Sequence, residues 1–148
     1  MTGVVVVTGV PGIPVADVAA ALAETLRLAH VSVDGIQDEL ALEADDTPRD
    51  WLRLDAEREL KRRVEAFGGA VVLDVVLVDD AEAERLVTVL SPWWADLVEV
   101  RCAEPDVPSP SLNAPRTVIL DGTRPPAVAD LAAVLRDETR PTRRVRRR

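Results

Sequence analysis

Few residues of this sequence could carry out chemistry, because its reactive side chains are scarce. The 148 residues include one histidine (His30), one cysteine (Cys102) and one lysine (Lys61). Zinc sites are built mostly from several histidines and cysteines, and a disulfide needs two cysteines, so the chain excludes both. A Ser-His-Asp hydrolase would have to use His30, and the nucleophile-elbow pattern Gly-x-Ser-x-Gly is absent. The chemistry that is left belongs to carboxylates, guanidinium groups and the backbone of one turn.

That turn is Gly9-Val10-Pro11-Gly12-Ile13-Pro14, and it lies between two strongly apolar segments. The unbroken valines of Val4–Val7 predict a strand buried on both faces. Apolar residues recur in Val15–Ala29 at helical spacing, which predicts a helix there. A glycine-containing turn that opens a helix can hold phosphate through backbone N–H groups. The alternative is an ordinary strand-to-helix connection with no ligand.

Hydrophobic patterning predicts further strands and helices that alternate along the chain. The expected strands are 30–34, 70–78, 97–102 and 117–120, and the expected helices are 36–44, 49–67, 81–90 and 125–137. Such alternation predicts an α/β domain with a doubly wound, parallel, five-stranded sheet between two helix layers. We expect this domain to span residues 1–138, followed by a basic tail at 139–148.

The formal net charge of −8 is spread unevenly, because six arginines lie within residues 140–148. We expect this tail, including Arg143 and Arg144, to be a solvated terminus or to meet an acidic partner or nucleic acid. The Trp93-Trp94 pair is expected to plug a helix end or to anchor an interface, since tryptophan is enriched at binding hot spots. The expected partner is another protein or a second copy of the chain.

The chain resembles the small P-loop kinases, the group of zeta-toxin-like, gluconate-, shikimate- and adenylate-kinase-like proteins, over about residues 3–137. The resemblance rests on Val4-Val5-Val6-Val7-Thr8-Gly9-Val10-Pro11-Gly12 and on the small apolar helix that follows. Weaker matches are Val33-Asp34-Gly35-Ile36, Val71-Val72-Leu73-Asp74 and the segments 80–85, 97–101 and 118–122. The resemblance implies a P-loop kinase-like fold. It also implies that Asp34 lies near an acceptor substrate, that Asp74 is the acid of the third strand, and that Arg85 is the arginine of the next helix.

The first loop departs from the phosphate-loop pattern G-x-x-x-x-G-K-[ST]. Counted from Gly9, the second glycine is Pro14, the lysine is Val15 and the hydroxyl residue is Ala16. Proline removes an N–H donor, valine removes the cation for the β- and γ-phosphates, and alanine removes a Mg²⁺ ligand. The lid that the resemblance implies is also reduced, because Ala103–Pro115 contains no arginine or lysine.

These losses predict a catalytically inactive P-loop kinase-like domain that serves as a binding, regulatory or structural interaction module. Under this prediction the chain has no catalytic residues, no metal and no cofactor. The vestigial nucleotide loop consists of Gly9, Val10, Pro11, Gly12, Ile13, Pro14, Val15 and Ala16. The alternative is a noncanonical ATP-binding small-molecule phosphotransferase, for which ATP and Mg²⁺ would be required. Its leftover cleft would gather Asp34, Asp74, Arg85, Arg101 and Arg116 in one place.

No apolar run approaches the ~20 residues that span a bilayer, and the N-terminus lacks the basic region of a signal peptide. We therefore expect a soluble, cytoplasmic protein without a membrane span.

Overall fold

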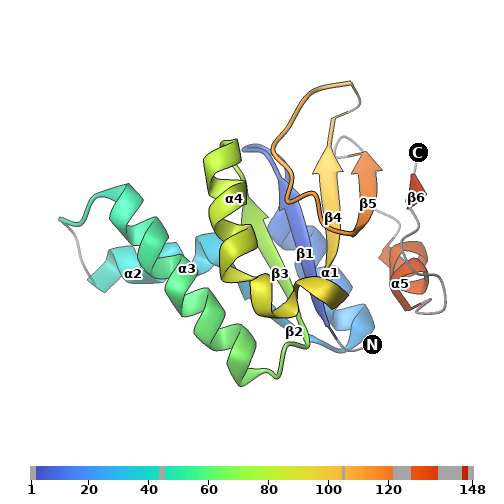
Figure 1. Ribbon diagram of the computed structural model, residues 1–148, viewed down its shortest axis with the longest axis horizontal. Helices are drawn as coiled ribbons and strands as arrows, with labels where there is room; N and C mark the ends of the chain where they lie inside the picture. The colour runs from blue at the N-terminus through green and yellow to red at the C-terminus, as the bar shows by residue number, and fades with distance from the viewer. Residues whose placement is uncertain (1–2, 44–45, 105, 122–127, 137–144, 147–148) are drawn as a thin grey trace.

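The computed structural model describes residues 3–43, 46–104, 106–121, 128–136 and 145–146. A parallel sheet with the strand order β2-β3-β1-β4-β5-β6 forms its centre (Figure 1). The strands are β1 Val4–Gly9, β2 Ala29–Ser32, β3 Val71–Val76, β4 Val98–Ala103, β5 Arg116–Asp121 and β6 Val145–Arg146. The five predicted strands are present and parallel, so the predicted α/β architecture is confirmed.

Helices cover both faces of this sheet. They are α1 Val15–Leu26, α2 Val33–Glu43, α3 Arg49–Ala66, α4 Asp80–Val89 and α5 Val128–Arg136, with a 3₁₀ helix, η1, at Ser91–Asp96. Side chains of α1 and α5 pack with Val5 and Val7 of β1, whereas those of α2, α3 and α4 pack with Val4 and Val6. The valine run is therefore buried from two sides, as expected for a central parallel strand.

The sixth strand lies within the segment predicted as a basic tail. Val118 and Ile119 of β5 face Val145 and Arg146 of β6 in parallel register. Arg143 and Arg144, which we expected to be solvated or to meet an acidic partner or nucleic acid, lie outside the described residues. Part of the predicted tail thus extends the sheet at its β5 edge.

The two neighbouring tryptophans lie in η1 and pack, partly buried, against the core formed with α2, α3 and α4. Trp93 closes over the turn that follows α3, where a Cβ on Gly69 would lie 2.8 Å from Trp93 Cδ1. Gly69 also has a φ of +77°, which favours glycine. These contacts match the plug at a helix end, and a role in an interface stays a prediction.

Candidate functional site

The first loop turns from β1 into α1 through bonds made within the loop itself. Ile13 N–H donates to Val10 O (3.2 Å), and Val15 N–H donates to Ile13 O (2.8 Å). Pro14 has no N–H, and Gly12 takes a φ of +97°. Two amide N–H groups of this segment therefore form hydrogen bonds within it and are not available to a ligand.

The side chain at the position of the pattern's lysine faces the protein interior. Val15 is 3% exposed and packs in the α1 side of the core. A Cβ on Gly9 would lie 2.6 Å from Val15 Cγ1, so this packing requires glycine at position 9. Ala16 has no hydroxyl group, and Asp17 adds a negative charge in the first turn of α1. These residues do not fit the usual Mg²⁺–triphosphate site.

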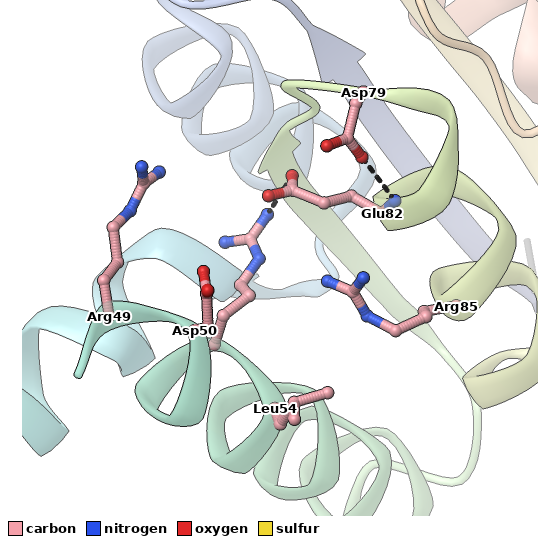
Figure 2. Close-up of a pocket in the computed structure, with 7 residues that line it drawn as sticks. Arg49, Asp50, Leu54, Asp79, Glu82 and Arg85 are labelled. Atoms are coloured by element: carbon pink, nitrogen blue, oxygen red, sulfur yellow. Dashed lines mark hydrogen bonds and ion pairs between the residues drawn. The ribbon is translucent and has the colours of Figure 1, made fainter. Parts of the chain in front are cut away.

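A pocket of about 340 Å³ opens between α3 and the start of α4 (Figure 2). Its lining combines three guanidinium groups with three carboxylates and one leucine: Arg49, Asp50, Arg53, Leu54, Asp79, Glu82 and Arg85. The pocket lies beyond the carboxyl end of β3, and Leu77 N–H donates to Gly9 O (2.8 Å) at that end. The pocket and the first loop therefore share one edge of the sheet, where open α/β sheets bind ligands.

Arg53 is the buried cation of this pocket, with 6% of the residue exposed. Its Nη1 donates to Asp34 Oδ1 (2.9 Å), and its Nη2 donates to Val76 O (3.0 Å). Nη2 also lies 3.5 Å from Glu82 Oε2, whereas Nε has no hydrogen-bond partner. Arg53 thus joins α2, α3, β3 and α4 at the edge of the pocket.

Arg85 is held on the opposite wall by Glu57, which is 5% exposed. Arg85 Nε donates to Glu57 Oε1 (3.2 Å), and its Nη2 donates to Glu57 Oε2 (3.4 Å). This hydrogen bonding raises the pKa of the Arg85 guanidinium group above its ordinary value. Arg85 therefore presents a fixed positive charge to the pocket.

No protein-family model matches the chain, and no curated protein sequence does. Solved structures do match. A putative kinase from Chloroflexus aurantiacus is 16% identical with a TM-score of 0.72, covering 93% of this chain and 96% of that one. A sugar kinase from Janibacter is 16% identical with a TM-score of 0.64, covering 93% and 95%. The APS kinase of Mycobacterium tuberculosis, in complex with AMPPNP and APS, is 17% identical with a TM-score of 0.61, covering 92% and 96%.

The chain has a P-loop kinase-like fold.

The prediction of an inactive interaction module is contradicted by these likenesses. The structures that share the P-loop kinase-like fold over more than nine-tenths of the chain are described as a putative kinase, a sugar kinase and an APS kinase. They agree better with the alternative that we predicted, a noncanonical small-molecule phosphotransferase. The losses in the first loop and in the lid segment concern neither α3 nor α4, which supply the residues of the pocket.

The structure brings together only part of the cleft predicted from the sequence. Asp34 and Arg85 converge on the pocket, Asp34 through Arg53 and Arg85 as a lining residue. Asp74 contacts Ser32 and His30 of β2 instead. Arg101 lies in β4, and its Nη2 donates to Ser109 O in the segment that follows this strand. Arg116 is the first residue of β5.

Sequence reasoning missed Arg53, Glu57, Asp79 and Glu82. One signal could have found the first two: Arg53 and Glu57 interrupt the buried face that Leu52, Ala56 and Leu60 give to α3. Charged residues are almost never fully buried unless they are paired. Charged side chains on the buried face of a helix therefore indicate that another helix or strand supplies their partners.

The segment between β4 and β5, where the resemblance implies a lid, is a strap on the sheet. We define the strap as residues 106–115; it contains no helix or strand, and Leu112 and Ala114 are buried in the core. Ser111 Oγ donates to Glu99 Oε1 (2.8 Å), which fastens the strap to β4. In Figure 1 the strap runs along the sheet between α4 and β5.

Restoring the loop pattern tests how far the first loop limits nucleotide binding. In a variant with Pro14→Gly, Val15→Lys and Ala16→Ser, we expect ATP to bind at least about 10-fold more tightly, because one charge-assisted contact contributes about 1.5–3 kcal/mol. We expect a lower melting temperature, because Val15 leaves the core. Calorimetric titration with Mg-ATP measures the affinity, and Ala16→Ser alone is the control. Equal affinities of the wild type and the triple variant would contradict this prediction.

Proposed function

We propose that the protein is a small-molecule phosphotransferase that binds its acceptor in the pocket between α3 and α4. The observation that carries the proposal is the pocket of arginines and carboxylates at the same sheet edge as the first loop, with Arg53 and Arg85 held by carboxylates, in a fold shared with kinases. The pocket volume of about 340 Å³ suits a small metabolite rather than a macromolecule. In this proposal ATP approaches the pocket along the sheet edge that the pocket shares with the first loop, without the lysine and hydroxyl contacts of the usual phosphate loop.

The charge balance of the pocket favours an acceptor with several hydroxyl groups. Three guanidinium groups face three carboxylates, so the lining carries no net charge. Carboxylates accept hydrogen bonds from hydroxyl groups, and guanidinium groups donate to hydroxyl or ring oxygens. A strongly anionic acceptor would leave the carboxylates facing its charge. The sugar kinase among the similar structures agrees with a sugar or polyol acceptor.

Asp79 is the carboxylate we assign as the proton acceptor. It follows β3 two residues after Leu77, whose N–H contacts Gly9 O, so it lies at the side of the pocket next to the first loop. In the proposed reaction the acceptor hydroxyl oxygen attacks the terminal phosphorus of ATP, its proton passes to Asp79, and the bond to the bridging oxygen of ADP breaks. General-base assistance of this kind contributes about 10²–10⁴-fold.

Asp79→Asn separates this role from a structural one. Asp79 Oδ1 accepts from Glu82 N–H (2.9 Å) as the N-cap of α4. Asparagine caps helices about as well as aspartate, so we expect the free energy of unfolding to change by less than about 1 kcal/mol. We expect kcat for phosphate-ester formation from Mg-ATP and a panel of hexoses, pentoses and polyols to fall by about 100-fold.

The matched control is Asp55→Asn, because Asp55 lies on the exposed side of α3, where its Oδ1 lies 3.5 Å from Arg58 Nη1. Its kcat is expected to equal that of the wild type. Full activity of Asp79→Asn would remove Asp79 from the reaction, and phosphorylation of no acceptor in the panel would contradict the proposed function.

A further inference from the structure

A second polar cluster lies at the β2 edge of the sheet, outside the pocket. It consists of His30 and Ser32 of β2 and Asp74 of β3, and we call it the edge cluster. Ser32 Oγ donates to Asp74 Oδ1 (2.8 Å), and His30 Nε2 contacts Asp74 Oδ2. Asp74 is 1% exposed, and His30 is the only histidine of the chain. A buried carboxylate with two side-chain partners from one neighbouring strand requires an explanation.

The edge cluster cannot touch an acceptor in the pocket. Along β3, Asp74 alternates with Leu73 and Val75, which pack on the α3 and α4 side, so it shares the opposite face with Val72. Side chains two residues apart point to the same face of a strand. Any effect of Asp74 on the pocket must therefore pass through other residues.

Two sets of hydrogen bonds, joined by the backbone between Asp34 and Gly35, connect the edge cluster to the pocket. Ser32 Oγ accepts from Gly35 N–H (3.0 Å) in the first turn of α2. The neighbouring Asp34 accepts from Val76 N–H at Oδ2 (2.9 Å) and from Arg53 at Oδ1 (2.9 Å). The start of α2 is thus bound to β3 at two points, one through Ser32 and one through Asp34.

The local chain leaves this start of α2 little freedom. β2 ends at Ser32 and α2 begins at Val33, so no loop separates the strand from the helix. A Cβ on Gly35 would lie 3.1 Å from Ser32 Cβ, so glycine permits this close approach. β2 is only four residues long and pairs with β3 on one side alone among the described strands. The contacts with Asp74 therefore add two side-chain attachments to the backbone pairing of this edge strand with β3.

We propose that Asp74 is a positioning residue for the acceptor pocket. Through Ser32 it fixes the start of α2, and through Asp34 it places the guanidinium group of Arg53. The positioning of Asp34 and Arg53 is a structural claim, and its effect on the acceptor rests on the proposed function. His30 is the second side chain that orients Asp74 in this arrangement.

Amide hydrogen exchange of the full chain tests the structural claim without any activity. In Ser32→Ala and Asp74→Ala, we expect the Val76 amide to exchange at least about 10-fold faster, because its acceptor Asp34 loses its anchor. The Gly35 amide is informative in Asp74→Ala, where its acceptor Ser32 is retained, and we expect it to exchange faster there as well. Asp74→Asn keeps an oxygen for Ser32 and is expected to restore slow exchange. The Leu112 amide, which Glu99 holds on another part of the sheet, is expected to keep its rate. Thr25→Ala removes an exposed hydroxyl of α1 and is the matched control for Ser32→Ala.

Steady-state kinetics, with a sugar or polyol that the protein is found to phosphorylate, tests the effect of Asp74 on acceptor binding. Ser32→Ala is expected to raise the acceptor KM by about 10-fold and to leave kcat within about twofold, since the displaced groups bind the acceptor. Unchanged exchange at Val76, or equal acceleration at Val76 and Leu112, would overturn the positioning role. If no acceptor is phosphorylated, the proposed function fails, and the exchange rates still decide the role of Asp74.

Discussion

Arg53→Met is expected to be among the most damaging single substitutions in this protein. It removes a buried cation that contacts Asp34, Val76 O and Glu82, and it leaves Glu57 buried with Arg85 as its remaining arginine partner. Removing one partner of a buried ion pair costs about 3–5 kcal/mol. We expect a loss of that size in the free energy of unfolding, measured by urea denaturation.

The same substitution is expected to abolish acceptor binding. Arg53 lines the pocket and also anchors Asp34, so its loss changes both the charge and the shape of the acceptor site. Arg58→Met is the matched control, because Arg58 lies on the same helix with 81% of its side chain exposed. Its stability should stay within about 0.5 kcal/mol of the wild type. A fully stable Arg53→Met protein that still phosphorylates its acceptor would contradict this prediction.

Glu99→Ala is expected to release the strap from the sheet. The Glu99 side chain is completely buried and accepts from Thr8 Oγ1 (2.7 Å), Ser111 Oγ (2.8 Å) and Leu112 N–H (3.2 Å). Alanine would leave these donors without their acceptor, and each hydrogen bond to a charged group contributes about 1.5–3 kcal/mol. We expect a loss of about 3–5 kcal/mol, which lowers the melting temperature by roughly 10 °C.

Hydrogen exchange locates this effect. In Glu99→Ala, the exchange rate of the Leu112 amide is expected to rise strongly. The exchange rates of β3 amides, such as that of Val76, are expected to rise only as far as the lower global stability requires. Glu99→Gln is the conservative control: it retains one acceptor oxygen and should lose less stability. Slow exchange of Leu112 in Glu99→Ala would show that burial of Leu112 and Ala114, rather than Glu99, holds the strap.

The fold could be predicted because its strands and helices carry local signals. Val4–Val7 is an apolar run, and Val71–Val76 is one except for Asp74, as expected for strands that helices cover on both faces, and the helices between them follow the helical period. The sixth strand could not be predicted, since a two-residue pairing between Val118 and Val145 leaves no pattern in the sequence. The composition of the strap predicts a loop. Its attachment to the sheet, however, depends on Glu99, which has no feature in the sequence that separates it from an ordinary strand carboxylate.

A residue of the candidate site could be predicted from the sequence only where its type and its position in a motif indicate a single role. The resemblance placed Asp34 near an acceptor, and the structure brings it to Arg53. Arg53 itself is invisible to patterning, because its partners come from α2, β3 and α4 and meet only in the fold. For Asp74 the sequence suggested an acid of the site, and the fold instead directs it to the opposite face of the sheet. The prediction of an inactive module rested on the losses in Pro14-Val15-Ala16 and in the lid segment, and the likeness of the whole chain to solved kinase structures contradicts it.

Detection of the transferred phosphate tests the central claim most directly. The full chain is incubated with Mg-ATP and each sugar or polyol, and the reaction is followed by ³¹P NMR. With at least one acceptor, we expect a phosphate-monoester resonance that grows in step with ADP, in equal amounts, and that grows far more slowly with Asp79→Asn. ATP that remains intact with every acceptor, or that yields only inorganic phosphate, would contradict it.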